Sequence, residues 1–406
     1  EYILESIGAG ATAVVNEDWH EKWENSPEYI QASNEIDEIN KEGLRLTATT
    51  TVTASEDKYL HSTYATSWFS QVKHVYFRTN LQFYRDPTYM FAKIGLYTLG
   101  GLFIGFTFWG LKHSIIGNQN ALFVAFLAVI ISNPLLNQIQ ERSMKSRVVY
   151  EARERMSNTF HWTALMVSQI LTEIPYNFFG STIYFLCSYF PLRIYQNSTL
   201  TGKFYFMVSI IYQIYICTFA IGIYYVSPDL PSAGLLGSVV TVFMFAFAGV
   251  LQPYSNLPGF WRFMYRVSPI TYVVESLSST LLHGREIHCS KSELAYFDPP
   301  SGQTCGEYVS DYISARGGYL VDPSATSDCG YCSYSDADTY IGSTRMMKYS
   351  HYWRNFGLFW VYIIFNVVSM MALYWLAKDA KFSTPKLFQK KQKAEKKPKV
   401  EQSDLA

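Results

Sequence analysis

The chain has 406 residues, and its 33 basic and 33 acidic side chains give a formal charge of zero. Nucleic-acid-binding proteins carry an excess of basic residues, so this balance argues against that class. The aromatic content of 17% is high, which is typical of chains whose rings lie at membrane interfaces.

The first 90 residues are predicted to precede the membrane. Residues 1–60 are polar, and we expect a cytoplasmic connector there. In the segment 61–90, Phe69, Val72, Tyr76 and Phe83 fall on one helical face, with basic residues elsewhere. A basic amphipathic helix directly before a span predicts an element lying on the inner leaflet, and a soluble packing helix is the alternative.

Six apolar segments are long enough to cross a bilayer, which takes about 20 mostly apolar residues. They are residues 91–110, 119–137, 162–190, 204–226, 233–251 and 355–377. The sequence therefore predicts an all-α membrane protein with six transmembrane helices. In the first span, Gly101 and Gly105 form a GxxxG pattern that lets helices pack closely. The third is long for one crossing and contains Pro175, so a kink or an extension into the cytosol is expected.

Basic residues near the spans indicate the orientation. The link between the second and third spans, residues 141–158, carries Arg142, Lys145, Arg147, Arg153 and Arg155, and the tail 379–406 is rich in lysine. We therefore expect both segments, and both termini, on the cytoplasmic side. The loop containing the sequon Asn197-Ser198-Thr199 then lies outside, where Asn197 is a candidate glycosylation site.

The segment 252–353 is predicted to be extracellular, and it holds four of the six cysteines: Cys289, Cys305, Cys329 and Cys332. An oxidising environment favours disulfides over a metal site, for which a second CxxC pair is missing. Three pairings are compatible with the sequence, and we favour the nested one, Cys289–Cys332 outside Cys305–Cys329. This predicts a disulfide-stapled lid.

Two features inside apolar stretches are left open by the sequence. The stretch that follows Pro269 is short for a span and contains Glu275, which favours a re-entrant hairpin over a seventh crossing. Glu173 is a carboxylate well inside the third apolar run, and either a functional or a structural role fits it. There is no phosphate loop or metalloprotease motif, so no catalytic or metal-binding residue is predicted.

Short segments along nearly the whole chain resemble fungal pleiotropic-drug-resistance ABC transporters, which are full-size members of the G subfamily. The segments that carry the resemblance are Glu1-Tyr2-Ile3-Leu4-Glu5, Asp18-Trp19 with Trp23, Tyr64-Ala65-Thr66-Ser67, Arg78-Thr79-Asn80-Leu81-Gln82, Gly105-Phe106-Thr107-Phe108, Asn137-Gln138-Ile139-Gln140, Ser188-Tyr189-Phe190-Pro191-Leu192 and Tyr352-Trp353-Arg354-Asn355-Phe356-Gly357. The resemblance implies that this chain is the second transmembrane half, with the nucleotide-binding domains and the first half elsewhere in the same polypeptide.

The resemblance also implies how the chain is driven. In this family the loop between the second and third spans of a half contacts the ATPase domain, so residues 141–158 are identified as a coupling helix. The residues expected to transmit the movement are Glu141, Arg142, Arg147, Glu151, Arg153 and Glu154. ATP and Mg²⁺ would bind in the missing domains, and no cofactor is expected in this chain.

The family's second and fifth spans line a central cavity, which implies a substrate path here. Phe247-Ala248-Gly249-Val250-Leu251 resembles the family's Phe-Ser-Gly-Leu-Leu valve, so Val250 and Leu251 are expected to form a gate, looser because Ala and Val replace Ser and Leu. The expected cavity-lining residues are Leu127, Ile131, Ser132, Leu135, Val242, Phe245 and Ala246. The implied function is ATP-driven export of amphipathic drugs or lipids across a fungal plasma membrane.

Two other functions fit the residues without the resemblance. One is a membrane anchor whose extracellular loop binds a ligand. The other is a proton-coupled carrier with Glu173 as the relay. Neither requires the charged segment 141–158.

Overall fold

The computed structural model describes residues 18–49, 62–194 and 197–378. It divides into two compact units, residues 1–65 and 66–406. In the first unit, α2 (Trp19–Glu24) begins where the Asp18 side chain accepts hydrogen bonds from the N–H groups of His20 and Glu21, and α3 (Pro27–Thr49) follows. The expected connector is therefore helical over these residues. The expected tail, 379–406, and the rest of the connector lie outside the described residues.

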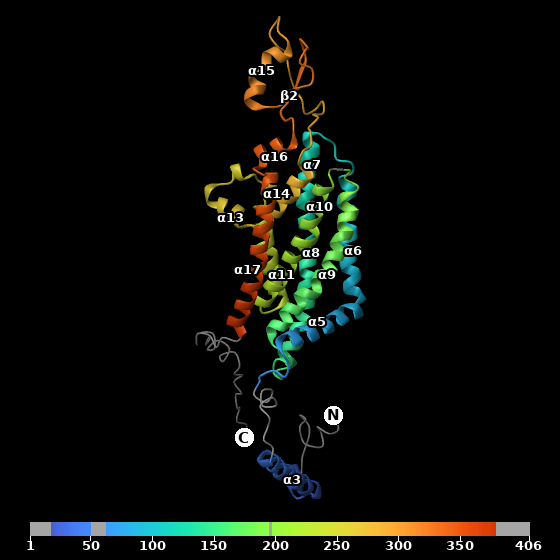
Figure 1. Cartoon of the computed structure of the whole chain (residues 1–406), viewed down its shortest axis with the longest axis vertical. Coiled ribbons are helices and arrows are strands. Elements are labelled where there is room, and N and C mark those ends of the chain that lie inside the picture. Colours follow the sequence, from blue (N-terminus) through green and yellow to red (C-terminus); the bar gives the residue numbers. More distant parts are fainter. Residues whose placement is uncertain (1–17, 50–61, 195–196, 379–406) are drawn as a thin grey trace, which may run out of the picture. The chain divides into compact units, whose positions relative to one another are not determined.

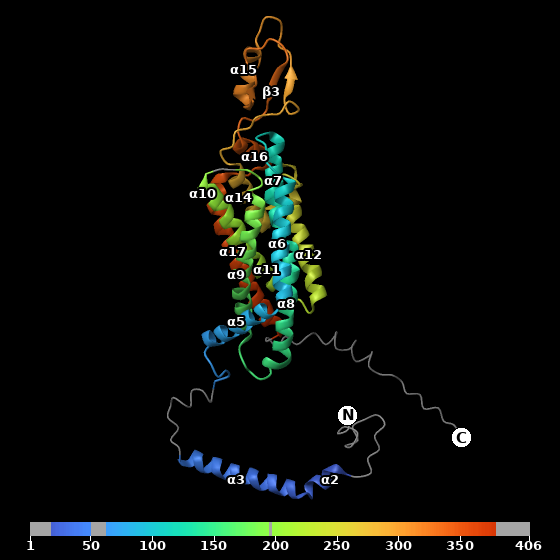
Figure 2. The same ribbon diagram turned by 90° about the vertical axis from the view of Figure 1, so that its right-hand side faces the viewer.

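The second unit is a bundle of long helices with a small domain at one end (Figures 1 and 2). Its helices up to the outer segment are α5 (Trp68–Arg85), α6 (Pro87–Thr107), α7 (Ile115–Ile130), α8 (Ser132–Val149), the π-helical turn η1 (Tyr150–Glu154), α9 (Trp162–Tyr189), α10 (Ser198–Phe206), the π-helical turn η2 (Met207–Ile211), α11 (Tyr212–Val226) and α12 (Leu230–Ala246). The last long helix is α17 (Tyr352–Lys378). Both views show α5 lying across the foot of the bundle, at the end opposite to the small domain.

Within the described residues, four helical stretches are both long and apolar enough to cross a membrane: Pro87–Thr107, Ile115–Glu154, Ser198–Val226 and Tyr349–Leu376. The third predicted span forms α9, which has 28 residues but carries Gln169, Glu173 and Asn177 among its buried positions. The fifth forms α12, which is apolar but has only 17 residues. Length and composition therefore support the membrane bundle without confirming the count of six.

The second span differs most from its predicted extent. We expected 119–137 followed by a separate coupling helix, but helical structure runs from Ile115 to Glu154. A break occurs only at Ile131, because Pro134 has no N–H to donate to the carbonyl of Ile130. The link is thus a continuation of the span beyond the apolar region.

The GxxxG pattern in α6 serves close contact with α9. A Cβ at Gly101 would lie 2.9 Å from the Cβ of Cys187, and one at Gly105 would lie 2.5 Å from the carbonyl oxygen of Cys187. Any side chain at these two positions would force the helices apart. Helix α9 itself continues through Pro175 as one element.

The face of α5 that packs on the bundle is rotated from the predicted one. The buried residues are Gln71, Val75, Thr79 and Phe83, whereas Phe69 is 79% exposed. The polar members can be buried because they are satisfied: the Gln71 amide donates to the carbonyl of Thr66 and accepts from the N–H of His161. The hydroxyl of Thr79 donates to the carbonyl of Val75. Of the predicted face, Phe83 is therefore buried, Val72 and Tyr76 are half-buried, and Phe69 alone is exposed.

The segment after α12 forms a compact outer layer. Short turns η3 (Tyr254–Asn256) and η4 (Gly259–Trp261) and helix α13 (Arg262–Val267) lead into α14 (Pro269–Leu282). Helix α14 has 14 residues, about 21 Å, which is too short for a bilayer core of about 30 Å. All its residues except Tyr272 are buried, and it packs against α7, α10 and α17. This geometry fits the predicted re-entrant element.

The small domain at the top of Figure 1 is the disulfide-stapled loop domain, and it adds a short sheet to the helical chain. It contains a three-stranded antiparallel sheet in the order β1 (Ala295–Phe297), β3 (Cys329–Cys332), β2 (Tyr319–Leu320), together with α15 (Cys305–Arg316). Helix α16 (Ala337–Arg345) and the turn η5 (Tyr349–His351) lead back to α17. The disulfides are Cys289–Cys332 and Cys305–Cys329, the nested pairing that we favoured.

Candidate functional site

The predicted coupling residues lie at the foot of the bundle, on the last turns of α8 and on η1. The π-helical turn of η1 ends the helical stretch, and Asn158 adopts a left-handed conformation with φ of 49° shortly after it. π-Helical turns inside α-helices occur frequently at functional sites. The geometry of the individual side chains shows which of them are available to a partner.

Arg147 connects three helices. Its guanidinium, which is buried, donates to the Glu151 carboxylate at 2.9 Å and to the carbonyls of Tyr224 and Ser227 at 3.0 and 3.1 Å. Those carbonyls belong to the C-terminal end of α11, where a cation is favoured by the helix dipole. Glu151 in turn accepts a hydrogen bond from the hydroxyl of Tyr374 on α17 at 3.3 Å.

Glu154 and Arg142 connect the same segment to α5 and α6. The buried Glu154 carboxylate forms a two-pronged ion pair with Arg78 of α5. Arg142 donates to Asp86 at 2.8 Å, and its guanidinium lies 5.0 Å from the ring of Phe83. Both charge-assisted pairs are partly shielded from water, so α5 is fixed to α8 and η1.

Glu141 and Arg153 are the exposed members of the predicted set. Glu141 pairs with Lys145 one turn away at 3.0 Å, with both side chains about 60% exposed. Arg153 is 78% exposed and lies 3.7 Å from Glu154. The structure therefore divides the six coupling candidates into four that contact other helices of the bundle and two that are exposed and pair only within the α8–η1 segment.

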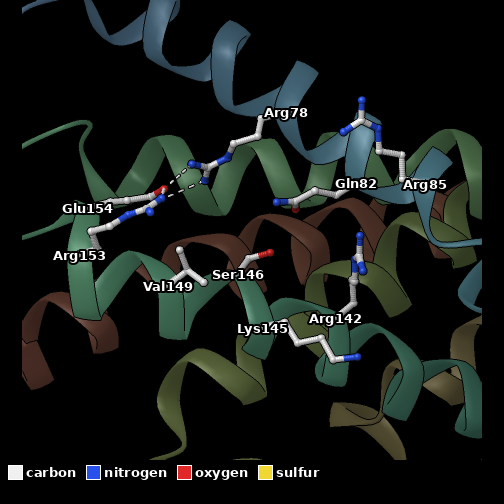
Figure 3. A pocket seen from close by; sticks show the side chains of 9 residues that line it. All are labelled: Arg78, Gln82, Arg85, Arg142, Lys145, Ser146, Val149, Arg153 and Glu154. Carbon is white, nitrogen blue, oxygen red and sulfur yellow. Dashed lines mark hydrogen bonds and ion pairs between the residues drawn. The ribbon is translucent and has the colours of Figure 1, made fainter. Parts of the chain in front are cut away.

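Between α5 and the α8–η1 segment lies a groove of about 410 Å³, shown in Figure 3. Five of its nine lining side chains are cationic. The lining residues are Arg78, Gln82, Arg85, Arg142, Lys145, Ser146, Val149, Arg153 and Glu154. We refer to it below as the basic groove.

The predicted path residues on α12 face two ways. Val242 is 64% exposed and belongs to an outward stripe with Leu235, Val239 and Phe243, whereas Phe245 is buried with its ring 5.8 Å from that of Phe126. Ala246 is half-buried and ends the helix. The outward stripe is apolar along its length, as expected of a surface that meets lipid or another apolar half.

The predicted valve is not helical, contrary to a span over 233–251. Helix α12 ends at Ala246, and Gly249 takes a left-handed φ of 81° that other residues rarely adopt. Val250 is buried, and its carbonyl accepts a hydrogen bond from Arg345 at 2.7 Å. Leu251, at 64% exposed, is the outward-facing residue of the pair.

On the second span, Leu127 and Ile131 are half-buried, while Ser132 and Leu135 are buried inside this chain. In this conformation other parts of this chain cover Ser132, which is 3% exposed, and Leu135, which is 0% exposed.

Glu173 lies in a buried network with a cation that sequence analysis missed. It forms an ion pair with Lys93 of α6 at 2.5 Å and accepts a hydrogen bond from the hydroxyl of Tyr89 at 2.6 Å. Lys93 also donates to Asn177 at 2.8 Å, one turn along α9. An acid within a membrane requires a partner, and that rule alone could have directed a search for a cation.

A second buried carboxylate, Glu275 of α14, was noted only as a reason against a seventh span. It accepts hydrogen bonds from Asn355 and from the ring nitrogen Nδ1 of His351, both at 2.8 Å, and from Arg354 at 3.3 Å. It therefore anchors the outer layer to the start of α17. The predicted glycosylation site, Asn197, is exposed and caps α10 by accepting from the N–H of Thr199.

The comparisons with known proteins point to one family. The sequence model described as ABC-2 type transporter matches residues 70–282, and that described as CDR ABC transporter matches residues 330–398. The protein SNQ2 of Saccharomyces cerevisiae is 44% identical over 387 residues, which cover 95% of this chain and 25% of that protein. The ABC multidrug transporter SNQ2 of Candida glabrata is 44% identical over 376 residues, which cover 93% of this chain and 25% of that protein. The ATP-dependent permease PDR12 of S. cerevisiae is 38% identical over 379 residues, which cover 93% of this chain and 25% of that protein. The chain thus spans about a quarter of the length of these curated relatives.

Proposed function

The chain belongs to the ABC-2 type transporter family, as the resemblance indicated, and from that premise we propose that it is one transmembrane half of an ATP-driven exporter. We propose that the exporter carries amphipathic drug-like molecules or lipids outward across a fungal plasma membrane. Nucleotide-binding domains and a first transmembrane half of the same polypeptide would complete it, with ATP and Mg²⁺ bound there.

The observation that carries this proposal is the helical stretch Ile115–Glu154. Its first half contains the candidate path residues Leu127 and Ile131, and its second half contains the candidate coupling residues. Its 40 residues correspond to about 60 Å of helix. A displacement of η1 by an ATPase domain would therefore reach the path through helical structure that is interrupted only at Ile131, rather than through a flexible loop.

The side chains at the foot of the bundle would distribute that displacement. Glu141 and Arg153 are exposed and suit contact with an ATPase domain. Glu154 would transmit the movement to α5 through Arg78, and Arg147 would transmit it to α11. With this assignment, the cytoplasmic side is the foot of the bundle, and the disulfide-bonded domain is outside.

The apolar stripe of α12 would form a wall of the path. Its members, Leu235, Val239, Val242 and Phe243, are exposed in this chain and carry no polar anchor. A cavity lined by such side chains binds molecules by apolar contact with little discrimination, which suits a drug exporter. Val250 and Leu251 would close its outer end.

The test uses the full-length transporter in a drug-sensitive yeast strain, with efflux of rhodamine and vanadate-sensitive ATP hydrolysis as the readouts. Val242→Trp should obstruct the path and reduce efflux at least fivefold while ATP hydrolysis continues. The matched control is Val361→Trp on α17, at a site that is 61% exposed. Equal efflux in both variants would refute the assignment of the α12 stripe.

Glu154→Ala tests the coupling segment separately. Loss of the Arg78 pair should reduce the efflux obtained per ATP hydrolysed, because α5 would no longer follow η1. Normal efflux and normal ATP hydrolysis in this variant would contradict the coupling role.

A further inference from the structure

We propose that a hollow in the outer layer binds the phosphate group of a phospholipid from the outer leaflet, whose acyl chains lie along α17. The hollow measures about 330 Å³ and is separate from the basic groove at the foot of the bundle. None of the residues assigned to the path or to coupling lines it. Among its lining residues are Tyr254, Arg266, Glu275, His351, Arg354 and Leu358. We call it the outer hollow.

The outer hollow lies at the disulfide-bonded end of the bundle. Figure 1 shows α13 beside α14 and α17, close to the small domain. Helix α14 ends at Leu282, shortly before Cys289, which pairs with Cys332. Disulfides form in an oxidising compartment. This end of the bundle therefore belongs on the outer side, the orientation on which the proposed function also rests.

The outer layer has an unusual surplus of cations. Residues 252–282 and 345–358 contain a single acid, Glu275, and five basic residues: Arg262, Arg266, Arg345, Lys348 and Arg354. Short segments that flank spans usually carry their excess of basic residues on the cytoplasmic side. A surplus at the opposite end runs against that bias and indicates an anionic ligand.

Two of these cations line the outer hollow. Arg266 is exposed, forms no ion pair within the described residues, and donates to the hydroxyl of Tyr254 at 3.0 Å. The side chain of Arg354 is 51% exposed and lies 3.3 Å from the buried carboxylate of Glu275. Two cations and one carboxylate leave a surplus of one positive charge while His351 is neutral. A phosphodiester carries one negative charge and would cancel that surplus, and guanidinium groups suit phosphate oxygens.

An apolar stripe leads from the outer hollow along α17. Arg354 and Leu358 line the hollow, and Val361, Phe365 and Val368 follow them on the same helical face. These last three side chains are 61%, 65% and 59% exposed. The helix rises about 16 Å from Arg354 to Phe365, which matches the roughly 15 Å of half a hydrocarbon core. A phosphate at Arg354 therefore puts the ends of its acyl chains near the bilayer centre.

Aromatic and apolar side chains around the outer hollow fit the depth of a headgroup. Trp353, beside Arg354, is 64% exposed, and on α13 Phe263 and Val267 are 50% and 59% exposed. Such side chains next to cations are typical of the membrane interface. The hydroxyl of Tyr362 donates to the carbonyl of Val267 at 2.8 Å, which holds α13 against α17.

The cationic hollow and the apolar stripe together select the ligand. A soluble phosphate compound would use the cations and leave the stripe uncovered. An apolar helix of a partner would cover the stripe and leave the surplus charge uncompensated. A phospholipid satisfies both surfaces at once.

The experiment measures lipid binding by the full-length transporter in detergent micelles. Phosphatidylcholine with a photoactivatable group in one acyl chain is titrated, and labelled peptides are identified by mass spectrometry. We expect saturable labelling of α17 near Phe365. Diacylglycerol with the same chains, which lacks the phosphate, should label this site at least fivefold more weakly.

Arg266→Gln should weaken the binding of phosphatidylcholine about fivefold, the effect of one basic residue near a membrane surface. Arg266 is exposed, so the variant should fold, and a monodisperse elution profile checks this. Arg262→Gln is the matched control, because Arg262 is exposed one turn earlier on α13 and does not line the hollow. It should change binding less than twofold.

Four results would overturn the proposal. Equal losses in Arg262→Gln and Arg266→Gln would show diffuse attraction, and equal labelling by diacylglycerol would show apolar contact without a phosphate site. Competition by glycerophosphocholine as strong as by the intact lipid would assign the hollow to a soluble phosphate compound. Displacement of the label by rhodamine would make it an exit site for transported molecules. Since no readout is transport, the proposed function can fail without affecting this result.

Discussion

Substitutions in the buried pair of Lys93 and Glu173 can distinguish a structural role of Glu173 from a proton-carrying role. We propose three variants: Glu173→Gln, Lys93→Met and the two combined. Both side chains are at most 3% exposed, so either single change leaves a charged or polar partner without compensation in an apolar surrounding. The double change removes both charges at once.

The expected magnitudes follow from burial. Breaking a buried pair by removing one partner costs about 3–5 kcal/mol, because the remaining charge stays desolvated. In the double variant no charge remains, and the cost is the lost hydrogen bonds to Tyr89 and Asn177, about 1–2 kcal/mol in total. The coupling free energy between the two positions should therefore be at least about 4 kcal/mol.

In the assay, membranes that contain the full-length transporter are heated, and the fraction of transporter that remains monodisperse is measured. Drug efflux is measured for the same variants. We expect both single variants to inactivate at lower temperature than the double variant, and the double variant to retain most of its efflux. If the double variant is stable but its transport is abolished, Glu173 acts in transport and the structural reasoning is wrong. If Glu173→Gln is as stable as the parent, the pair contributes nothing.

Three further predictions concern packing and the lid. Gly105→Leu should separate α6 from α9 and destabilise the bundle by about 3 kcal/mol, whereas Gly95→Leu, with open space at its Cβ, should not; heat inactivation compares them. Cys305→Ser should destabilise the lid by about 3 kcal/mol by opening the disulfide to Cys329, so proteolysis of the lid should accelerate, with Cys187→Ser as the neutral control. Burial alone would raise the pKa of Glu293, but N–H donors from α7 and Ser290 hold it below its usual 4.5. The hydrogen bonds to the ionised Glu293 carboxylate therefore stabilise the lid above pH 4.5 and are lost as the pH falls through the lowered pKa. Proteolysis of the lid should accelerate in this acid range in the parent protein but not in Glu293→Gln.

The sequence predicted those features that depend on local composition. Apolar runs located the long helices, and the close glycine contacts at Gly101 and Gly105 follow from a short motif. The concentration of cysteines in one polar segment predicted disulfides. The nested pairing was a preference among three, because spacing alone does not bring chain segments together.

The errors came from features decided by tertiary contacts. The face of α5 was assigned by hydrophobicity, but Gln71 and Thr79 are buried because the carbonyl of Thr66, the N–H of His161 and the carbonyl of Val75 satisfy them. No periodicity in α5 contains that information. The exposed Phe69 is explained only if a leaflet or a partner covers that side.

The partners of buried charges were missed for the same reason. Glu173 and Lys93 are 80 residues apart in the sequence, and Glu275 and Asn355 are also 80 apart. A single sequence shows that a buried acid needs a partner but cannot select one at such separation. Ser132 and Leu135, which we predicted to line the path, are buried inside this chain, and nothing in the sequence of the second span indicates which elements cover them.

The contacts of Arg147 and Glu154 would let the proposed coupling segment act on several helices at once. Glu154 binds α5, whereas Arg147 binds the C-terminal end of α11 and, through Glu151, the end of α17. Arg147 and Glu154 are seven residues apart on one helical stretch, so a rigid displacement of η1 moves both anchors together. A chain whose segment 141–158 were a separate helix on flexible links would lose this property. The helical stretch from Ile115 to Glu154, interrupted only at Ile131, is therefore the element on which the proposed coupling depends.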